Sequence, residues 1–122
     1  MSDLLLISII DDDESVRLAT ASLLRSEGYR TELFASAEEF LAGDVARFAC
    51  VVSDIQMAGM SGIDLTGRLL ADDANARIIL MTARTEDDLH QRASASGAVC
   101  LLRKPFAADQ LLACVERALD HG

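Results

Sequence analysis

Apolar and polar positions alternate in blocks along the chain. Residues 4–10, 48–53, 77–82 and 99–103 are apolar at most positions, and residues 30–34 form a weaker run of the same kind. A short run that is apolar on consecutive positions is typical of a strand in a parallel sheet covered on both faces. The pattern therefore predicts five strands.

Each predicted strand is followed by a segment with helical spacing of its apolar residues. In the first of these segments Val16, Leu23 and Leu24 share one side, which we expect to be buried together with Ala19, while Ala21 should point away from it. Ser36, Ser61 and Thr85 are expected to cap three of the others. The predicted helices span residues 15–27, 36–42, 61–71, 85–97 and 107–120.

Five β-α units in strict alternation predict a doubly wound α/β fold, a three-layer sandwich around a parallel five-stranded sheet. Five units are too few for a closed eight-fold barrel. In an open parallel sheet, ligands bind at the carboxyl ends of the strands. The residues that directly follow each strand therefore carry the functional hypothesis.

Composition and charge narrow the possible functions. The chain has 122 residues, enough for one domain, which we assign to residues 1–122. The net charge of −9 disfavours direct binding of nucleic acid. No apolar stretch approaches the ~20 residues of a membrane span, and the start lacks the basic region of a signal peptide. We therefore expect a cytoplasmic protein that makes no membrane contact.

Charged and hydroxyl side chains stand at four of the predicted strand ends. Asp11 and Asp12 follow the first strand, Asp54 the third, Thr82 ends the fourth and Lys104 follows the fifth. Three carboxylates and one ammonium leave a charge of −2, which a divalent cation would neutralise. Carboxylate oxygens suit Mg²⁺. A carboxylate beside such a cation can act as a nucleophile toward phosphorus.

The remaining aspartate of the acidic run has a different expected role. Asp13 lies just before the first predicted helix, where a carboxylate can accept hydrogen bonds from the amides of Ser15 and Val16. We therefore predict that Asp13 is a helix cap and that Asp11 and Asp12 belong to the metal site.

This set of motifs resembles the receiver domain of two-component response regulators, the CheY-like family, and the resemblance covers essentially the whole chain. It implies a flavodoxin-like strand order of 2-1-3-4-5 and a signalling domain that is not an enzyme beyond its own phosphorylation and dephosphorylation. The motifs that carry the resemblance are Asp11-Asp12, Asp54, Thr82-Ala83 and Lys104-Pro105-Phe106.

The resemblance also implies a role for each site residue. Asp54 would accept a phosphoryl group from a sensor histidine kinase. Mg²⁺ or Mn²⁺ would be held by Asp11, Asp12, Asp54 and the backbone carbonyl of Gln56. Thr82 and Lys104 would contact the phosphoryl group. The bond between Lys104 and Pro105 is expected to be cis. The first helix would dock the kinase, which makes Leu18 and Ser22 docking candidates.

Residues 34–41 are similar to receivers of the FixJ type, which usually precede a LuxR-type helix-turn-helix domain. We expect the chain to be either an excised receiver, which we favour, or a stand-alone single-domain regulator. The partners implied are the kinase, a DNA-binding output domain in the full-length protein and a phosphorylation-dependent homodimer.

Two positions depart from the family pattern. Ala58 stands where receivers commonly have a proline, and Gly59 follows it, so we expect the loop from residue 55 to 61 to be looser than usual. Leu101 stands where many receivers carry an aromatic residue that moves together with the threonine at the position of Thr82. We expect the switch formed by Thr82 and Leu101 to be weakly coupled as a result.

Two other functions share parts of this pattern. A flavin-binding module would need a phosphate loop after the first strand, where this chain has three consecutive carboxylates. A Mg²⁺-dependent phosphohydrolase with an aspartate nucleophile is the closer alternative, but such enzymes usually carry D-x-D and a cap domain. Repeated turnover of a phosphomonoester would identify a phosphohydrolase.

Overall fold

The computed structural model describes residues 5–120 and contains one parallel five-stranded sheet in the order β2-β1-β3-β4-β5. The prediction of the fold is confirmed, and the strand bounds differ from it by at most two residues. The predicted start of the first strand, at residue 4, lies outside the described residues. The strands are β1 (Leu6–Ile10), β2 (Arg30–Phe34), β3 (Cys50–Asp54), β4 (Ile78–Thr82) and β5 (Cys100–Arg103).

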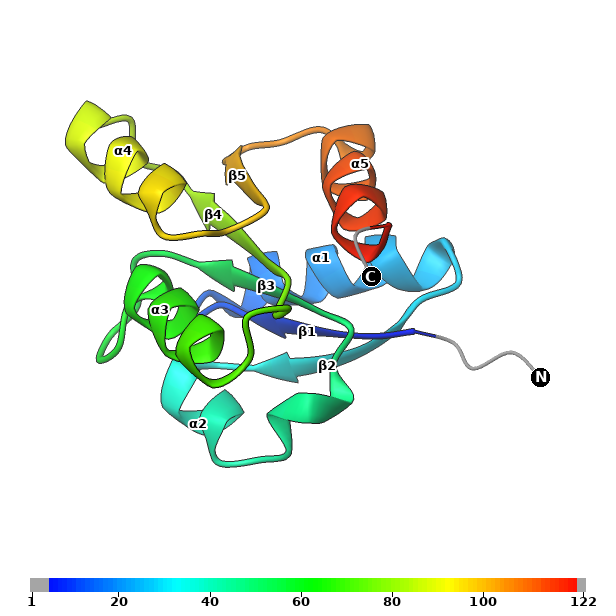
Figure 1. The fold of residues 1–122 in the computed structure, drawn as a ribbon. Coiled ribbons are helices and arrows are strands. Elements are labelled where there is room, and N and C mark those ends of the chain that lie inside the picture. Colours follow the sequence, from blue (N-terminus) through cyan, green and yellow to red (C-terminus); the bar gives the residue numbers. More distant parts are fainter. Residues whose placement is uncertain (1–4, 121–122) are drawn as a thin grey trace.

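Figure 1 shows the sheet between two helical layers, with α1 and α5 on one face and α2, α3 and α4 on the other. A short 3₁₀ helix, η1, precedes β3 and was not predicted from the sequence. The elements are α1 (Glu14–Ser26), α2 (Ala37–Leu41), η1 (Val45–Arg47), α3 (Gly62–Asp72), α4 (Asp87–Ala95) and α5 (Ala108–Leu119). No helix within residues 5–120 is long and apolar enough to cross a membrane.

Two hydrophobic cores explain why the strands read as unbroken apolar runs. Along β4, Ile79 and Met81 belong to the core under α1 and α5, while Ile78 and Leu80 belong to the core under α2, α3 and α4. Successive side chains of a strand point to opposite faces, and here each face is covered by helices. β4 is therefore buried at every position.

Two predictions about the helices are wrong. Ala21 is 1% exposed and Ala19 is exposed, the reverse of the expectation. The small residues Thr20 and Ala21 face the sheet, and the Thr20 hydroxyl can be buried because it donates to the Val16 carbonyl at 2.8 Å. Thr85 does not cap α4, because the helix begins at Asp87 and its N-cap position is Glu86.

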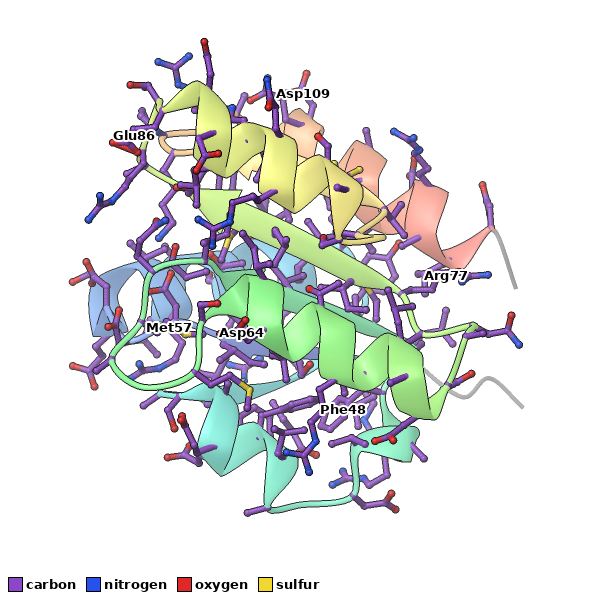
Figure 2. The ribbon with its side chains drawn as sticks, turned by 60° about the vertical axis from the view of Figure 1, so that its left-hand side comes forward. Phe48, Met57, Asp64, Arg77, Glu86 and Asp109 are labelled. Carbon is purple, nitrogen blue, oxygen red and sulfur yellow. The ribbon has the colours of Figure 1, made fainter. Side chains whose placement is uncertain are left out.

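The other predicted caps are confirmed, and they fix where the loops at the carboxyl ends of the strands end and the helices begin. The Asp13 carboxylate accepts from the amides of Ser15 and Val16, and the Ser61 hydroxyl accepts from the Asp64 amide. Figure 2 shows Met57, in the loop after β3, at the opposite end of the molecule from Arg77, which precedes β4. The candidate site lies at the end marked by Met57.

Candidate functional site

The carboxyl edge of the sheet brings two aspartates and a lysine into direct contact. Lys104 Nζ donates to Asp11 Oδ2 at 2.9 Å and lies 3.3 Å from Asp54 Oδ1. The Asp11 side chain is fully buried, and the side chains of Asp54 and Lys104 are 9% and 17% exposed. Asp11 and Lys104 are 93 positions apart in the sequence, and the parallel sheet brings them together.

Backbone and side-chain contacts hold Asp11 in this position. Its Oδ1 accepts from the Asp13 amide at 2.9 Å, while Oδ2 is bound by Lys104. The Asp11 carbonyl accepts from Arg17 Nη1 at 2.6 Å. The first turn of α1 therefore orients the first carboxylate of the site.

The backbone at Asp54 is packed against the start of α3 at a glycine. A Cβ atom built on Gly62 would stand 2.3 Å from the carbonyl oxygen of Asp54, far inside van der Waals contact. The Gly62 amide also donates to the Ile55 carbonyl at 3.0 Å. Position 62 thus needs a residue without a side chain, a requirement not predicted from the sequence, in which Ser61-Gly62 indicates only a helix cap.

The three aspartates form the group expected for a cation. Carboxylate oxygens of Asp11, Asp12 and Asp54 all lie within 4.8 Å of one another. Asp12 is exposed, whereas Asp11 and Asp54 are buried. The donor set consists of hard oxygen ligands with one solvent-facing side, which fits a divalent cation that keeps part of its water shell.

The electrostatics of the site leave one carboxylate poorly compensated. Burial, together with the charges of Asp11 and Asp12, raises the pKa of Asp54 to about 6, although Lys104 acts in the opposite direction. Burial lowers the pKa of Lys104, but its contacts with Asp11 and Asp54 outweigh this and raise it overall. The ammonium is therefore firmly charged, and the unmet negative charge sits at Asp54.

Thr82 and Gln56 meet beside this cluster. Thr82 ends β4 and is fully buried. Its hydroxyl donates to Gln56 Oε1 at 2.9 Å and accepts from the Arg84 amide at 3.0 Å. The Lys104 amide donates to the Thr82 carbonyl at 2.7 Å, which ties the ends of β4 and β5 together. The peptide bond between Lys104 and Pro105 is cis, as the resemblance implies.

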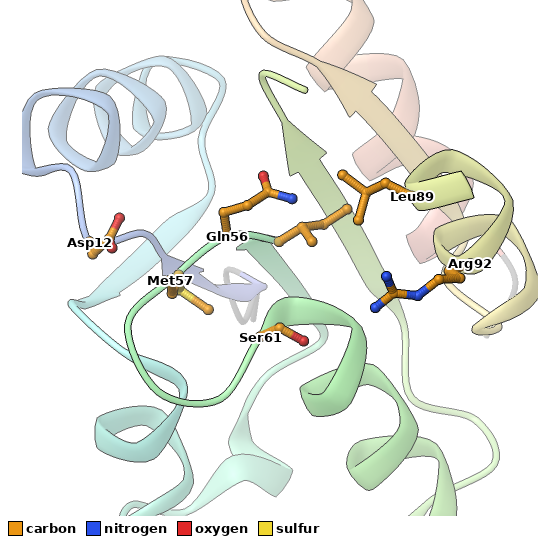
Figure 3. Close-up of a pocket in the computed structure, with 7 residues that line it drawn as sticks. Asp12, Gln56, Met57, Ser61, Leu89 and Arg92 are labelled. Carbon is orange, nitrogen blue, oxygen red and sulfur yellow. The ribbon is translucent and has the colours of Figure 1, made fainter. Parts of the chain in front are cut away.

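A pocket opens next to the cluster between the loop after β3 and helix α4. Figure 3 shows Gln56 and Met57 on one side of it and Leu89 and Arg92, from α4, on the other, with Asp12 at its edge. The volume is about 440 Å³. The carboxylate cluster is therefore accessible from solvent on the side of Asp12.

Comparison with known families decides what kind of domain this is. The family model of the response regulator receiver domain matches residues 7–116. The chain belongs to this family. It is a receiver domain of the kind found in two-component response regulators, and the match favours this interpretation over a flavin module or a phosphohydrolase.

One of the individual relatives of this receiver domain is a FixJ protein, in agreement with the FixJ-type resemblance. This chain is 40% identical over 117 residues to the transcriptional regulatory protein FixJ of Bradyrhizobium diazoefficiens, and the match covers 95% of this chain and 57% of that protein. It is 41% identical over 111 residues to the C4-dicarboxylate transport transcriptional regulatory protein DctD of Rhizobium meliloti, covering 90% of this chain and 24% of that protein. The chain thus spans only part of these relatives.

A solved structure named FixJ-N has the same fold as this receiver domain. The two superpose with a TM-score of 0.88 at 31% sequence identity, over 100% of this chain and 98% of that one. The sheet order and the arrangement of its covering helices are therefore those of a receiver.

The structure places the last predicted site residue, Leu101, away from the carboxylates. Leu101 lies on β5, partly buried against the core under α2, α3 and α4. Its role in a switch stays a prediction. The roles of Asp11, Asp12, Asp54, Thr82 and Lys104 belong to the proposal below.

A carboxylate from α2 holds the loop of the receiver domain that follows Asp54. Glu38 Oε2 accepts from the Met60 amide at 2.8 Å. Gly59 has a φ of +82°, and a Cβ atom there would stand 2.6 Å from the same carboxylate oxygen. The pair Ala58-Gly59 predicts a loose loop, and nothing in the sequence indicates this anchor, because residues 38 and 60 are joined only in the folded chain.

We predict that Glu38→Ala loosens this loop. The Met60 amide should exchange its hydrogen several-fold faster, because its acceptor is lost, while amides of β3 stay protected. Hydrogen exchange followed by NMR measures this. The hydrogen bond from the Met60 amide lowers the pKa of the Glu38 carboxyl group. The anchor is therefore present at neutral pH and is lost as the pH falls through that lowered pKa.

The exposed neighbour Glu39 supplies a control for the loop experiment. Glu39→Ala removes a carboxylate that accepts from the Ala35 amide instead. It should leave Met60 exchange unchanged. Equal acceleration of Met60 in both variants would contradict a specific anchor at Glu38.

We also predict separate roles for Asp12, which should account for the Mg²⁺ response, and Asp13, which should act only as a helix cap. Mg²⁺ should raise the melting temperature of the wild type, and Asp12→Ala should lose most of that rise because a ligand is missing. Asp13→Ala removes the cap of α1, which costs about 1 kcal/mol, and should lower the melting temperature equally with and without Mg²⁺. Thermal melts in EDTA and in MgCl₂ measure both effects. Equal loss of the Mg²⁺ response in both variants would contradict these separate roles.

Proposed function

We propose that residues 1–122 form a single receiver domain in which Asp54 accepts a phosphoryl group from a phosphohistidine of a sensor histidine kinase. The observation that carries this proposal is the contact of Asp54 and Asp11 with Lys104 at the carboxyl edge of the sheet, with the Asp12 carboxylate close to both. The charge arrangement supports transfer of a group that is itself strongly negative, because an ammonium and a cation site flank the nucleophile.

Each site residue has a part in the proposed transfer. Asp54 attacks phosphorus with one carboxylate oxygen, the bond from phosphorus to the histidine nitrogen breaks, and that nitrogen leaves on the kinase. Lys104 then pairs with a phosphoryl oxygen. Asp11, Asp12, Asp54 and the backbone carbonyl of Gln56 would hold Mg²⁺ or Mn²⁺, and the cation would supply positive charge beside the phosphoryl oxygens. Thr82 donates to a phosphoryl oxygen once the group is in place.

An apolar hollow beside the site supports the assignment of the kinase surface. It has a volume of about 500 Å³ and opens between α1 and the segment after β5. Leu18, on the exposed side of α1, is 51% exposed. Apolar side chains near a reactive carboxylate fit a protein partner that must bring its phosphohistidine to Asp54. The hollow is lined by Val16, Ala19, Thr20, Leu23, Pro105 and Phe106, among others.

The proposed output follows from the family and from the switch residues. Phosphorylation would draw Thr82 toward the phosphoryl group and change the packing of Leu101, altering the face formed by α4 and β5. In the full-length protein this face would control a DNA-binding domain or a homodimer. The domain makes no direct contact with nucleic acid or membrane in this proposal, and the cytoplasmic location expected from its composition is part of it.

Intact-mass measurement with acetyl phosphate and Mg²⁺ tests the proposal. The wild type should gain one phosphoryl group per chain, and Asp54→Asn should gain none. Asp72→Asn, which changes an exposed carboxylate at the end of α3, should behave as the wild type. A wild-type gain that persists in Asp54→Asn would overturn the assignment, and repeated turnover of a phosphomonoester would support a phosphohydrolase instead.

A further inference from the structure

The side chain of Gln56 contacts the hydroxyl group on which the proposed switch depends. Gln56 follows β3 by two residues, and its Oε1 accepts the hydrogen bond of the Thr82 hydroxyl at 2.9 Å. Only the backbone carbonyl of Gln56 has a part in the proposed metal site. The amide side chain is free to have a role of its own.

The hydroxyl of Thr82 has a single proton, and that proton is already donated in a hydrogen bond. It points to Gln56 Oε1, while the oxygen itself accepts from the Arg84 amide. A hydroxyl donates one hydrogen bond only. Thr82 therefore cannot donate to a phosphoryl oxygen until its bond to Gln56 breaks.

We propose that Gln56 is a positioning residue that holds Thr82 in the unphosphorylated arrangement and competes with the phosphoryl group for its hydroxyl proton. The inference rests on the proposed function and adds to it the residue that opposes the switch. Thr82 is fully buried and Gln56 half-buried, so the hydrogen bond between them is shielded from water. Losing this bond should therefore affect the position of the Thr82 hydroxyl. The more stable the hydrogen bond from Thr82 to Gln56 is, the weaker the response to phosphorylation becomes.

Removing the competing acceptor should make the phosphoryl group easier to bind. Gln56→Met keeps the length of the side chain without the amide oxygen. Because a buried hydrogen bond contributes about 1 kcal/mol, this variant should bind beryllofluoride, a mimic of the phosphoryl group, roughly three- to tenfold more tightly than the wild type at saturating Mg²⁺. Titration followed by backbone amide NMR gives the affinities.

A double-mutant cycle separates competition for Thr82 from a general effect on the site. In a Thr82→Ala background there is no hydroxyl to release, so Gln56→Met should change the affinity by less than twofold. Gln91→Met, the same substitution at an exposed position of α4, should have no effect in either background. The same ratio in both backgrounds would overturn the inference.

The Arg84 amide supplies a second readout that does not depend on ligand affinity. Its hydrogen bond to the Thr82 hydroxyl reports where that hydroxyl lies. In Gln56→Met without ligand, the Arg84 signal should move part of the way toward its position in the beryllofluoride-bound wild type. A wild type that binds beryllofluoride while Gln56→Met shows neither tighter binding nor this movement would overturn the inference alone. A wild type that binds none would overturn the proposed function and this inference together.

Discussion

Lys104→Met should lower the stability of the metal-free protein by roughly 2–4 kcal/mol, and Mg²⁺ should restore much of the loss. Lys104 pairs with Asp11 at 2.9 Å and with Asp54 at 3.3 Å, and its side chain is only 17% exposed. Removing one partner of a fully buried ion pair costs about 3–5 kcal/mol because the other charge is left uncompensated. We take a lower range because Lys104 is not fully buried. Methionine keeps most of the length of the side chain and removes the ammonium group.

Urea unfolding of both proteins in EDTA and in MgCl₂ measures this effect. Arg103→Met, at the exposed neighbouring position in β5, is the matched control and should show no Mg²⁺-dependent difference from the wild type. Lys104 is also the only lysine of the chain, so selective labelling gives a single ammonium signal to follow. Equal stability of Lys104→Met and the wild type in EDTA would contradict an ion pair of this strength.

Asp54→Asn should be more stable than the wild type in EDTA at neutral pH and should lose most of its response to Mg²⁺. The buried carboxylate of Asp54 lies close to Asp11 and Asp12, and only Lys104 compensates it among the contacts described for residues 5–120. Asparagine has nearly the same shape and no charge. For a domain of this size each kcal/mol gained corresponds to roughly 3–6 °C in melting temperature.

The advantage of Asp54→Asn should depend on pH in a defined direction. Burial and the neighbouring carboxylates raise the pKa of Asp54 from 3.8 to about 6, so the folded protein binds this proton more tightly than the unfolded chain does. The wild type therefore has the full benefit of protonation below pH ~4 and loses it as the pH rises through about 6. The variant has no such proton to lose.

Melting curves of the two proteins from pH 4.5 to 7.5 in EDTA check this, since the effects of the other carboxyl groups cancel in the difference. The difference in melting temperature should be small at pH 4.5 and largest at pH 7.5. With saturating Mg²⁺ the wild type should instead have the higher melting temperature, because it alone keeps the Asp54 carboxylate as a ligand of the cation. A difference that does not change with pH would contradict the raised pKa.

The strands were predictable because their burial is a property of consecutive residues. Ile78, Ile79, Leu80 and Met81 are all apolar because both faces of β4 are covered, and this appears in the sequence without any knowledge of partners. The helix bounds and two side-chain caps were likewise local, since Asp13 and Ser61 bond to amides two or three residues away. Ala21 was misplaced because a helical repeat shows that one side is buried without showing which small residues touch the sheet.

The sequence by itself determined that this chain folds as alternating strands and helices and that carboxylates, a hydroxyl and a lysine follow the strands. Strand ends at one edge of a parallel sheet lie side by side, so local order was enough to predict that Asp11, Asp54 and Lys104 would be neighbours. Only the tertiary structure decided the contacts of Gln56 with Thr82 and of Glu38 with Met60, which join residues 26 and 22 positions apart. Side-chain hydrogen bonds of this kind depend on distances of about 3 Å between loops, and no periodicity in the chain encodes such distances.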